Sequence, residues 1–203
     1  MFSDTYKMLS LPSQGEFKDR GSKFYAYAFP IKDEEDIKNQ LQELRKKHYD
    51  ARHHAYAYIL GVDKAAWRIN DDGEPSGSSG KPIHGQLLSY DLTNTLIVVI
   101  RYFGGTKLGI PGLINAYRSA AQNAIDEGQI IIKKIEDVYE LKFGYPDINT
   151  VMKILKDEGI NPLTTDFQID CKLQFKIRKK DSSRIYDQFK AIHTLKIDYI
   201  KTV

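Results

Sequence analysis

Apolar positions along the first 130 residues follow two periods, and together they predict strands interleaved with helices. Residues 23–30 and 53–60 have the composition of strands, and residues 95–101 form a continuous apolar run typical of a strand buried on both faces. Residues 33–49 predict a helix, because apolar residues recur at helical spacing between acids in the first turn and the bases Arg45, Lys46 and Lys47 near its end. Residues 113–128 predict a second helix with small apolar residues on one side.

The last third of the chain has a regular order of elements of its own. Its apolar pattern predicts strand–helix–strand–strand–helix–strand, which is the ferredoxin-like arrangement. The sequence therefore predicts an α+β protein of two domains, residues 1–135 and residues 136–203. The predicted strands are residues 138–143, 160–167, 169–178 and 195–200, and the predicted helices are residues 147–158 and 181–192.

Composition places the chain among ordinary globular proteins. Of its 203 residues 41% are hydrophobic and 28% are charged, and the longest apolar run, residues 96–100, is too short to span a bilayer, so no membrane partner is expected. The N-terminal residues lack the pattern of a signal peptide, and a single cysteine, Cys171, excludes an intramolecular disulfide framework; both favour a cytoplasmic location. The net charge of +3 gives little support for a dedicated nucleic-acid-binding protein.

Two glycine-rich loops bracket the apolar strand at residues 95–101. Residues 70–112 hold eight of the fourteen glycines, and glycine is needed where the backbone turns left-handed or approaches another group closely. We expect backbone N–H groups, hydroxyls and cations to converge there on an anion, beside a helix N-terminus. Arg101 is hard to bury without an acidic partner. The predicted anion-binding residues are Ser78, Ser79, Gly80, Lys81, Arg101, Gly104, Gly105 and Lys107, and the supporting acids are Asp71, Asp72 and Glu74.

No recognised catalytic or cofactor motif accompanies these loops. Their spacing fits neither the G-x-x-x-x-G-K-[ST] nor the G-x-G-x-x-G template, so no cofactor is expected. His53 and His54 are adjacent in a strand and point to opposite faces, so they do not ligate one metal, and no metal site is predicted. No nucleophile–base pair has a recognised spacing, so no catalytic residue is assigned. The sequence leaves the roles of His53, His54 and His84 open.

The ferredoxin-like domain permits a test for RNA binding. In the strand that starts at residue 169 the odd positions are apolar, with Cys171 facing the core, and the even positions are polar or charged. A sheet that reads RNA as an RRM does needs aromatic side chains on its open face, and this strand offers lysines instead, so readout of that type is not expected. Phosphate contacts remain open to Lys176, Arg178, Lys179 and Lys180.

Four stretches of the sequence resemble one known family. DDGEPSGSSGKP and RYFGGTKLGIPGLINAYRSA look like the signature of the Impact (YigZ-type) family, and SKFYAYA and DARHHAYAY are similar to its other recurring segments. The resemblance covers residues 15–130 in order. It implies an N-terminal domain like domain IV of elongation factor G, with the α+β fold of ribosomal protein S5 domain 2, and a ferredoxin-like C-terminal domain like domain V.

The resemblance also implies a role in translation. In its eukaryotic branch it implies a regulator that acts through protein contacts with a stress-kinase pathway and with actin, and in its bacterial branch a two-domain protein with no settled activity. We therefore expect a non-catalytic regulator that binds RNA, the ribosome or a protein partner in translation control. The alternative is an enzyme that acts on a small phosphorylated or carboxylated substrate at the glycine loops, using Asp72 or Glu74 beside a histidine.

Overall fold

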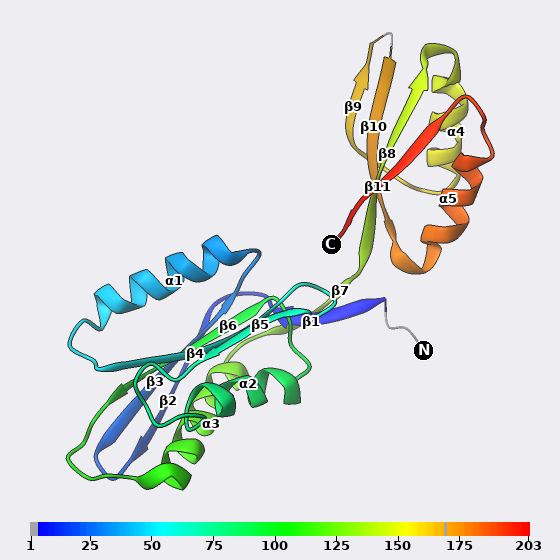
Figure 1. The fold of residues 1–203 in the computed structure, drawn as a ribbon. Coiled ribbons are helices and arrows are strands. Elements are labelled where there is room, and N and C mark those ends of the chain that lie inside the picture. Colours follow the sequence, from blue (N-terminus) through cyan, green and yellow to red (C-terminus); the bar gives the residue numbers. More distant parts are fainter. Residues whose placement is uncertain (1–3, 169) are drawn as a thin grey trace. The chain divides into compact units, whose positions relative to one another are not determined.

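The computed structural model describes residues 4–168 and 170–203, and the chain forms two compact units (Figure 1). One unit is Tyr6–Lys133, and the other is Lys134–Val203 together with the described N-terminal residues Asp4 and Thr5. Both units contain helices and strands, which confirms the predicted α+β class. The division into domains at residue 135 stays a prediction about independent folding.

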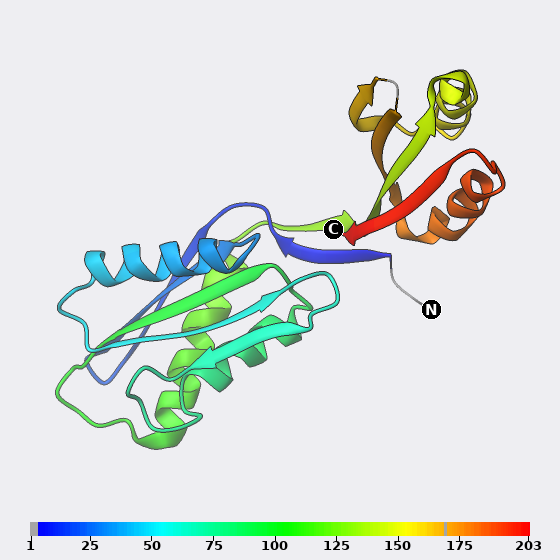
Figure 2. The ribbon, with the colours of Figure 1, turned by 45° about the horizontal axis from the view of Figure 1, so that its top comes forward.

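The first unit is a five-stranded antiparallel sheet covered by helices on both faces (Figure 1, Figure 2). Helix α1 (Glu34–Lys47) packs on one face, and helices α2 (Gly80–Ser89) and α3 (Gly109–Asp126) pack on the other. The central strand is apolar and buried along nearly its whole length, as its sequence predicts. In spatial order the strands are β2 (Ser13–Asp19), β3 (Ser22–Pro30), β6 (Thr95–Tyr102), β4 (His53–Leu60) and β5 (Ala66–Asn70).

Side chains alternate between the two faces of the sheet, and the face under α2 and α3 carries smaller side chains than the face under α1. Ala55 and Ala57 on β4 belong to the core that contains α2 and α3. At Gly15 on β2 an added Cβ would lie only 2.3 Å from the backbone nitrogen of Ala124, so α3 lies directly on the backbone of β2. The opposite face carries larger side chains, and Tyr56 packs there with the apolar side of α1.

Some element boundaries differ from the predicted ones. Helix α1 begins as predicted, because the Asp33 carboxylate accepts a hydrogen bond from the backbone nitrogen of Asp36 at 2.9 Å. Helix α3 begins at Gly109 instead of residue 113, since Pro111 fits the first helical turn, where a backbone N–H has no intrahelical partner. Four strands were not predicted, namely β1 (Thr5–Leu9), β2, β5 and β7 (Ile130–Lys134), and β1 and β7 pair with each other.

The second unit has the predicted ferredoxin-like order. Helices α4 (Ile148–Asp157) and α5 (Ser182–Lys190) pack on one face of a four-stranded antiparallel sheet, and Cys171 is buried in the core between them, as predicted. Residue 169, where the third strand was predicted to begin, lies outside the described residues. In spatial order the strands are β11 (Lys196–Thr202), β8 (Glu136–Gly144), β10 (Asp170–Arg178) and β9 (Pro162–Phe167), and short 3-10 turns span Tyr145–Asp147 and Lys179–Asp181.

Candidate functional site

Both glycine loops lie at one end of the five-stranded sheet. Because neighbouring strands are antiparallel, β3 and β4 begin where β2 and β6 end. The loop at residues 71–79 contacts Arg101 and His53, and the loop at residues 103–108 contacts the β2–β3 turn at Gly21. We call this region the loop end; it holds all the predicted anion-binding residues and supporting acids of the first unit.

The carboxylate of Asp71 fills the centre of the first loop. Its Oδ1 accepts hydrogen bonds from the backbone nitrogens of Ser79 and Gly80, at 3.1 and 2.8 Å, and from the Ser79 hydroxyl at 2.8 Å. Its Oδ2 accepts a hydrogen bond from the backbone nitrogen of Gly77 at 2.8 Å. Burial alone would raise the pKa of Asp71, but these hydrogen bonds outweigh it and hold the pKa below its usual value.

This geometry shows where three of the predicted anion-binding residues direct their donors. Ser78, Ser79 and Gly80 are buried and direct their donors inward: the Ser78 hydroxyl donates to the carbonyl oxygen of Pro75 at 2.6 Å, and the other two residues bind Asp71. The donors of the loop surround a carboxylate of the same loop, that of Asp71, and the binding of an external anion there stays a prediction. The types and spacing of residues could not distinguish these two occupants, since both need the same donors.

Arg101 has the acidic partner that its burial requires. Its Nη1 donates to Glu74 Oε1 and Oε2 at 2.8 and 3.0 Å, and the hydroxyl of Tyr117 on α3 donates to Oε1 at 2.7 Å. The guanidinium carbon lies 5.6 Å from the ring centre of Phe24 and 5.5 Å from that of Phe103. Burial and the Glu74 carboxylate raise the pKa of Tyr117 far above its usual value. The expected pairing of Arg101 with an acid of this loop is confirmed, and it connects the loop, β6 and α3.

Asp72 connects the same loop to α1 and β4. Its Oδ1 accepts a hydrogen bond from Arg45 at 3.0 Å, and its Oδ2 accepts one from the backbone nitrogen of His54 at 2.7 Å. Its carbonyl oxygen lies 2.9 Å from Nδ1 of His53. Because His53 and His54 are adjacent residues of the strand β4, their side chains point to opposite faces, as predicted, and His54 is buried. The third histidine left open, His84, packs its ring against Trp67.

The second glycine loop is set by close packing. A Cβ at Gly104 would lie 1.9 Å from the backbone carbon of Gly21, and the Gly104 nitrogen donates to the Ser22 hydroxyl at 3.1 Å. Gly105 has a φ of +90°, which favours glycine, and open space where a Cβ would stand. Of the predicted cations at the loop end, Lys81 and Lys107 are exposed.

The predicted phosphate contacts of the second unit are partly engaged in ion pairs. Lys176 Nζ lies 2.6 Å from Glu136 Oε2, and Arg178 forms an ion pair with Asp4. Lys179 and Lys180 are exposed. On β10 the even positions carry no aromatic side chain, which is the composition expected from the sequence.

A chain of polar side chains at the loop end was not predicted. The Tyr102 hydroxyl donates to Asp50 Oδ1 at 2.9 Å, His48 Nδ1 lies 2.9 Å from that hydroxyl, and His48 Nε2 lies 2.9 Å from the Tyr27 hydroxyl. Burial and the Asp50 carboxylate raise the pKa of Tyr102 to about 12, whereas burial and Lys47 lower the pKa of His48. The only sequence signal was a histidine just after a helix, opposite strands that carry alternate tyrosines. His48, Asp50 and Tyr102 of this chain line a cavity of 530 Å³ together with Gly21, Lys23, Tyr25 and Phe103.

Within residues 4–168 and 170–203 no three His, Cys, Asp or Glu side chains gather as metal ligands would. Over the same residues no helix combines the length and the apolar character that crossing a membrane requires.

Comparisons with known proteins agree on one family. The family model described as the Impact N-terminal domain matches residues 20–125. YvyE of Bacillus subtilis, an IMPACT family member, is 31% identical over 136 residues, which is 67% of this chain and 63% of its own length, so the match spans less than two thirds of that relative. An IMPACT family member of Haemophilus influenzae is 30% identical over 161 residues, 78% of each chain.

One solved structure is similar over nearly the whole chain. A crystal structure described as that of a hypothetical protein aligns with 98% of this chain and 99% of its own, at 25% identity and a TM-score of 0.75. The segment matched by the family model, residues 20–125, includes the Asp71 cradle, the Glu74–Arg101–Tyr117 cluster and both glycine loops. The chain belongs to the IMPACT family.

Proposed function

We propose that this protein is a non-catalytic regulator of translation that works by binding RNA, the ribosome or a protein partner in translation control. The signature resembles that of the IMPACT family, and this resemblance implies a role in translation. Membership of the chain in that family supports the role. The observation that carries the non-catalytic part is the inward direction of that signature: Asp71 binds its own loop, and Glu74 binds Arg101 and Tyr117. The side chains of the signature stabilise the fold, and the exposed surface of the protein is left to bind a partner.

Catalysis at these loops would require an acid or base that reaches a substrate. The Glu74 side chain is only 3% exposed, and both of its oxygens are bonded to Arg101. Asp72 binds Arg45 and the backbone of β4. Both acids first considered as a general base are therefore engaged in hydrogen bonds within the chain.

Sedimentation of the full-length chain tests this function. The purified protein is added to a clarified cell lysate, and the mixture is separated on a sucrose gradient with and without ribonuclease. We expect the chain in ribosomal fractions or in a complex that contains a translation factor, and ribonuclease tells the RNA-dependent from the protein-dependent case. Migration at its unbound position under every condition contradicts the proposal.

One observation favours the enzyme alternative, namely the Tyr27–His48–Tyr102–Asp50 chain beside a cavity of 530 Å³. A neutral histidine between two hydroxyl groups is suited to moving a proton. Incubation with pools of phosphorylated and carboxylated metabolites tests this candidate by mass spectrometry. Turnover that is lost in His48→Gln would support it, and an unchanged pool would exclude it.

A further inference from the structure

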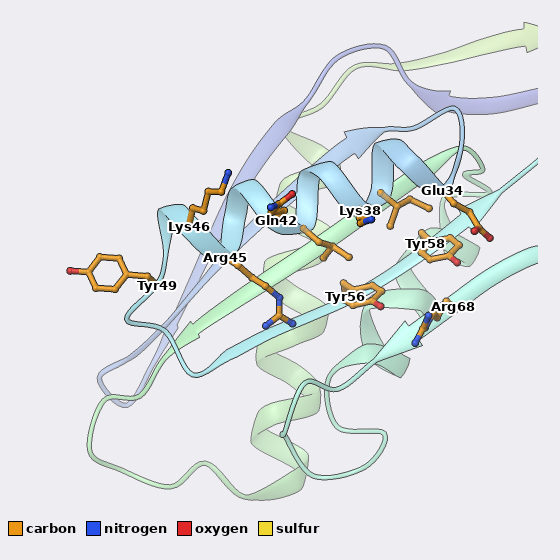
Figure 3. A pocket seen from close by; sticks show the side chains of 11 residues that line it. Glu34, Lys38, Gln42, Arg45, Lys46, Tyr49, Tyr56, Tyr58 and Arg68 are labelled. Carbon is orange, nitrogen blue, oxygen red and sulfur yellow. The ribbon is translucent and has the colours of Figure 1, made fainter.

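A groove runs along helix α1 on the sheet face opposite α2 and α3 (Figure 3). The apolar side of α1 packs on side chains of β3 and β6 and on Tyr56 of β4, and the surface that runs from Tyr58 to β5 beside the helix is left open. The resulting cavity has a volume of 870 Å³. That volume lies within the range of about 300–1,000 Å³ found for ligand sites.

Two tyrosines of β4 form the floor of this groove. Tyr56 and Tyr58 point to the α1 side because Ala55 and Ala57 occupy the other face. Tyr56 is mostly buried, whereas Tyr58 is half-buried and lies opposite Arg68 in the register of β4 and β5. Figure 3 shows the rings in succession along the strand, flanked by the side chains of Arg45 and Arg68.

The groove is more basic than the chain as a whole. Four cationic side chains and one carboxylate, that of Glu34, line it, although the chain has 30 basic and 27 acidic residues. Lys38 and Arg45 are seven residues apart on α1, which places them about 10 Å apart along the groove. The cations are Lys38, Arg45, Lys46 and Arg68, and all four are exposed; Arg45 is also paired with Asp72, and Lys46 with Glu43.

We propose that this groove binds single-stranded RNA, a role that rests on the proposed function and gives it a site. Tyrosine rings and arginine planes stack unpaired bases, and a row of cations beside them binds the phosphates. The strand must be single, because paired bases do not offer their faces to Tyr58. An acidic protein segment would neutralise the cations but would leave the tyrosine faces without a matching group.

Fluorescence anisotropy with a labelled single-stranded RNA decanucleotide tests the groove directly. Tyr58→Ala should weaken binding about tenfold, which is the effect of losing one stacked base, and Tyr58→Phe, which keeps the ring, should bind within about twofold of the wild type. Arg68→Ala should reduce the slope of log affinity against log salt by about 0.7, the share of one phosphate contact. Lys18→Ala removes a cation from β2, at the opposite edge of the sheet, and should leave affinity unchanged.

Three results would overturn this inference. The first is wild-type affinity in both Tyr58→Ala and Arg68→Ala, with thermal melting showing that both variants are folded. The second is equal loss in Lys18→Ala, which would indicate unspecific attraction of an anion. The third is no binding of the decanucleotide by the wild type together with saturable binding of an acidic peptide, which would assign the groove to a protein.

The same variants separate this inference from the proposed function. If Tyr58→Ala and Arg68→Ala bind RNA as the wild type does and still sediment with ribosomes, the groove is not the RNA-binding site and the translation role stands. If both variants no longer bind the decanucleotide while the wild type never enters a ribosomal or translation-factor complex, the groove is the RNA-binding site and the translation role is wrong.

Discussion

At the scale of single residues, Asp71 is the acid on which the first glycine loop is built. Asn in its place keeps one acceptor oxygen but presents an amide donor to the backbone nitrogen of Gly77 or to the Ser79–Gly80 donors. We expect Asp71→Asn to lower the free energy of unfolding by about 2 kcal/mol, the cost of a buried donor without an acceptor. Asp63→Asn is the control, because that exposed side chain accepts one backbone hydrogen bond that asparagine also accepts.

The pH dependence of stability gives an independent check on Asp71. Its pKa in the folded protein is lowered, so its ionised form stabilises the fold fully above the unfolded pKa of about 3.9. That contribution is lost as the pH falls through the lower folded-state pKa. The difference in stability between wild type and Asp71→Asn should therefore be constant near neutral pH and narrow in acid. A difference that widens below about pH 4 would contradict the assignment.

Arg101 is the second residue whose role the structure decides. Removal of its guanidinium leaves the Glu74 carboxylate and the Tyr117 hydroxyl buried without the cation, so Arg101→Ala should cost on the order of 3 kcal/mol in thermal or denaturant unfolding. A double-mutant cycle with Glu74→Ala measures the coupling between the two side chains. Unchanged stability in Arg101→Ala would instead make Arg101 available to a ligand.

The sequence could predict that Arg101 needs an acid, because a buried arginine is rare without one. It could not predict which of the three nearby acids serves, since that depends on the path of the loop. Nor could it show that Ser79 and Gly80 bind Asp71, because an internal and an external anion need the same donors. His48 was missed because its partners Tyr27 and Tyr102 are 21 and 54 residues away along the chain.

At the scale of elements, alanine substitutions at two glycines, Gly104 and Gly85, should change stability in opposite directions. At Gly104 a Cβ would meet the backbone of the β2–β3 turn, and nothing flexible is there to move, so Gly104→Ala should destabilise by about 2 kcal/mol or more. At Gly85, inside helix α2, a Cβ meets open space, so Gly85→Ala should stabilise by about 0.5–1 kcal/mol. Denaturant unfolding of both variants measures the difference. Equal stability of the two would contradict the packing of the second glycine loop against the turn.

Two of the four strands missed from the sequence share a physical cause. Strands β2 and β5 are the two edges of the five-stranded sheet, and β5 has four of its five residues exposed. An edge strand that buries few side chains has a weak apolar pattern, whereas the buried central strand β6 and the capped helix α1 have strong ones. The ferredoxin-like unit was predictable because its strands alternate clearly between a core face and an open face.

At the scale of the whole molecule, the second unit should fold by itself. Its core is formed by side chains of residues 139–197. A fragment of residues 136–203 lacks Asp4, the partner of Arg178, so we expect it to be less stable than in the full chain. About 70 residues without a disulfide supply only a few kcal/mol of stability. The expected result is a dispersed amide spectrum that matches the corresponding signals of the full chain. Poorly dispersed signals, as in an unfolded chain, would contradict the two-domain division.

Ultraviolet crosslinking of the full-length chain in living cells tests the translation role most directly. The crosslinked RNA is sequenced, and bound proteins and small molecules are identified by mass spectrometry from the same purified material. We expect ribosomal or transfer RNA, or proteins of the translation machinery, to be enriched over an untagged control. Stoichiometric recovery of a phosphorylated or carboxylated metabolite, with no enrichment of any translation component, would contradict the proposed function and favour the enzyme.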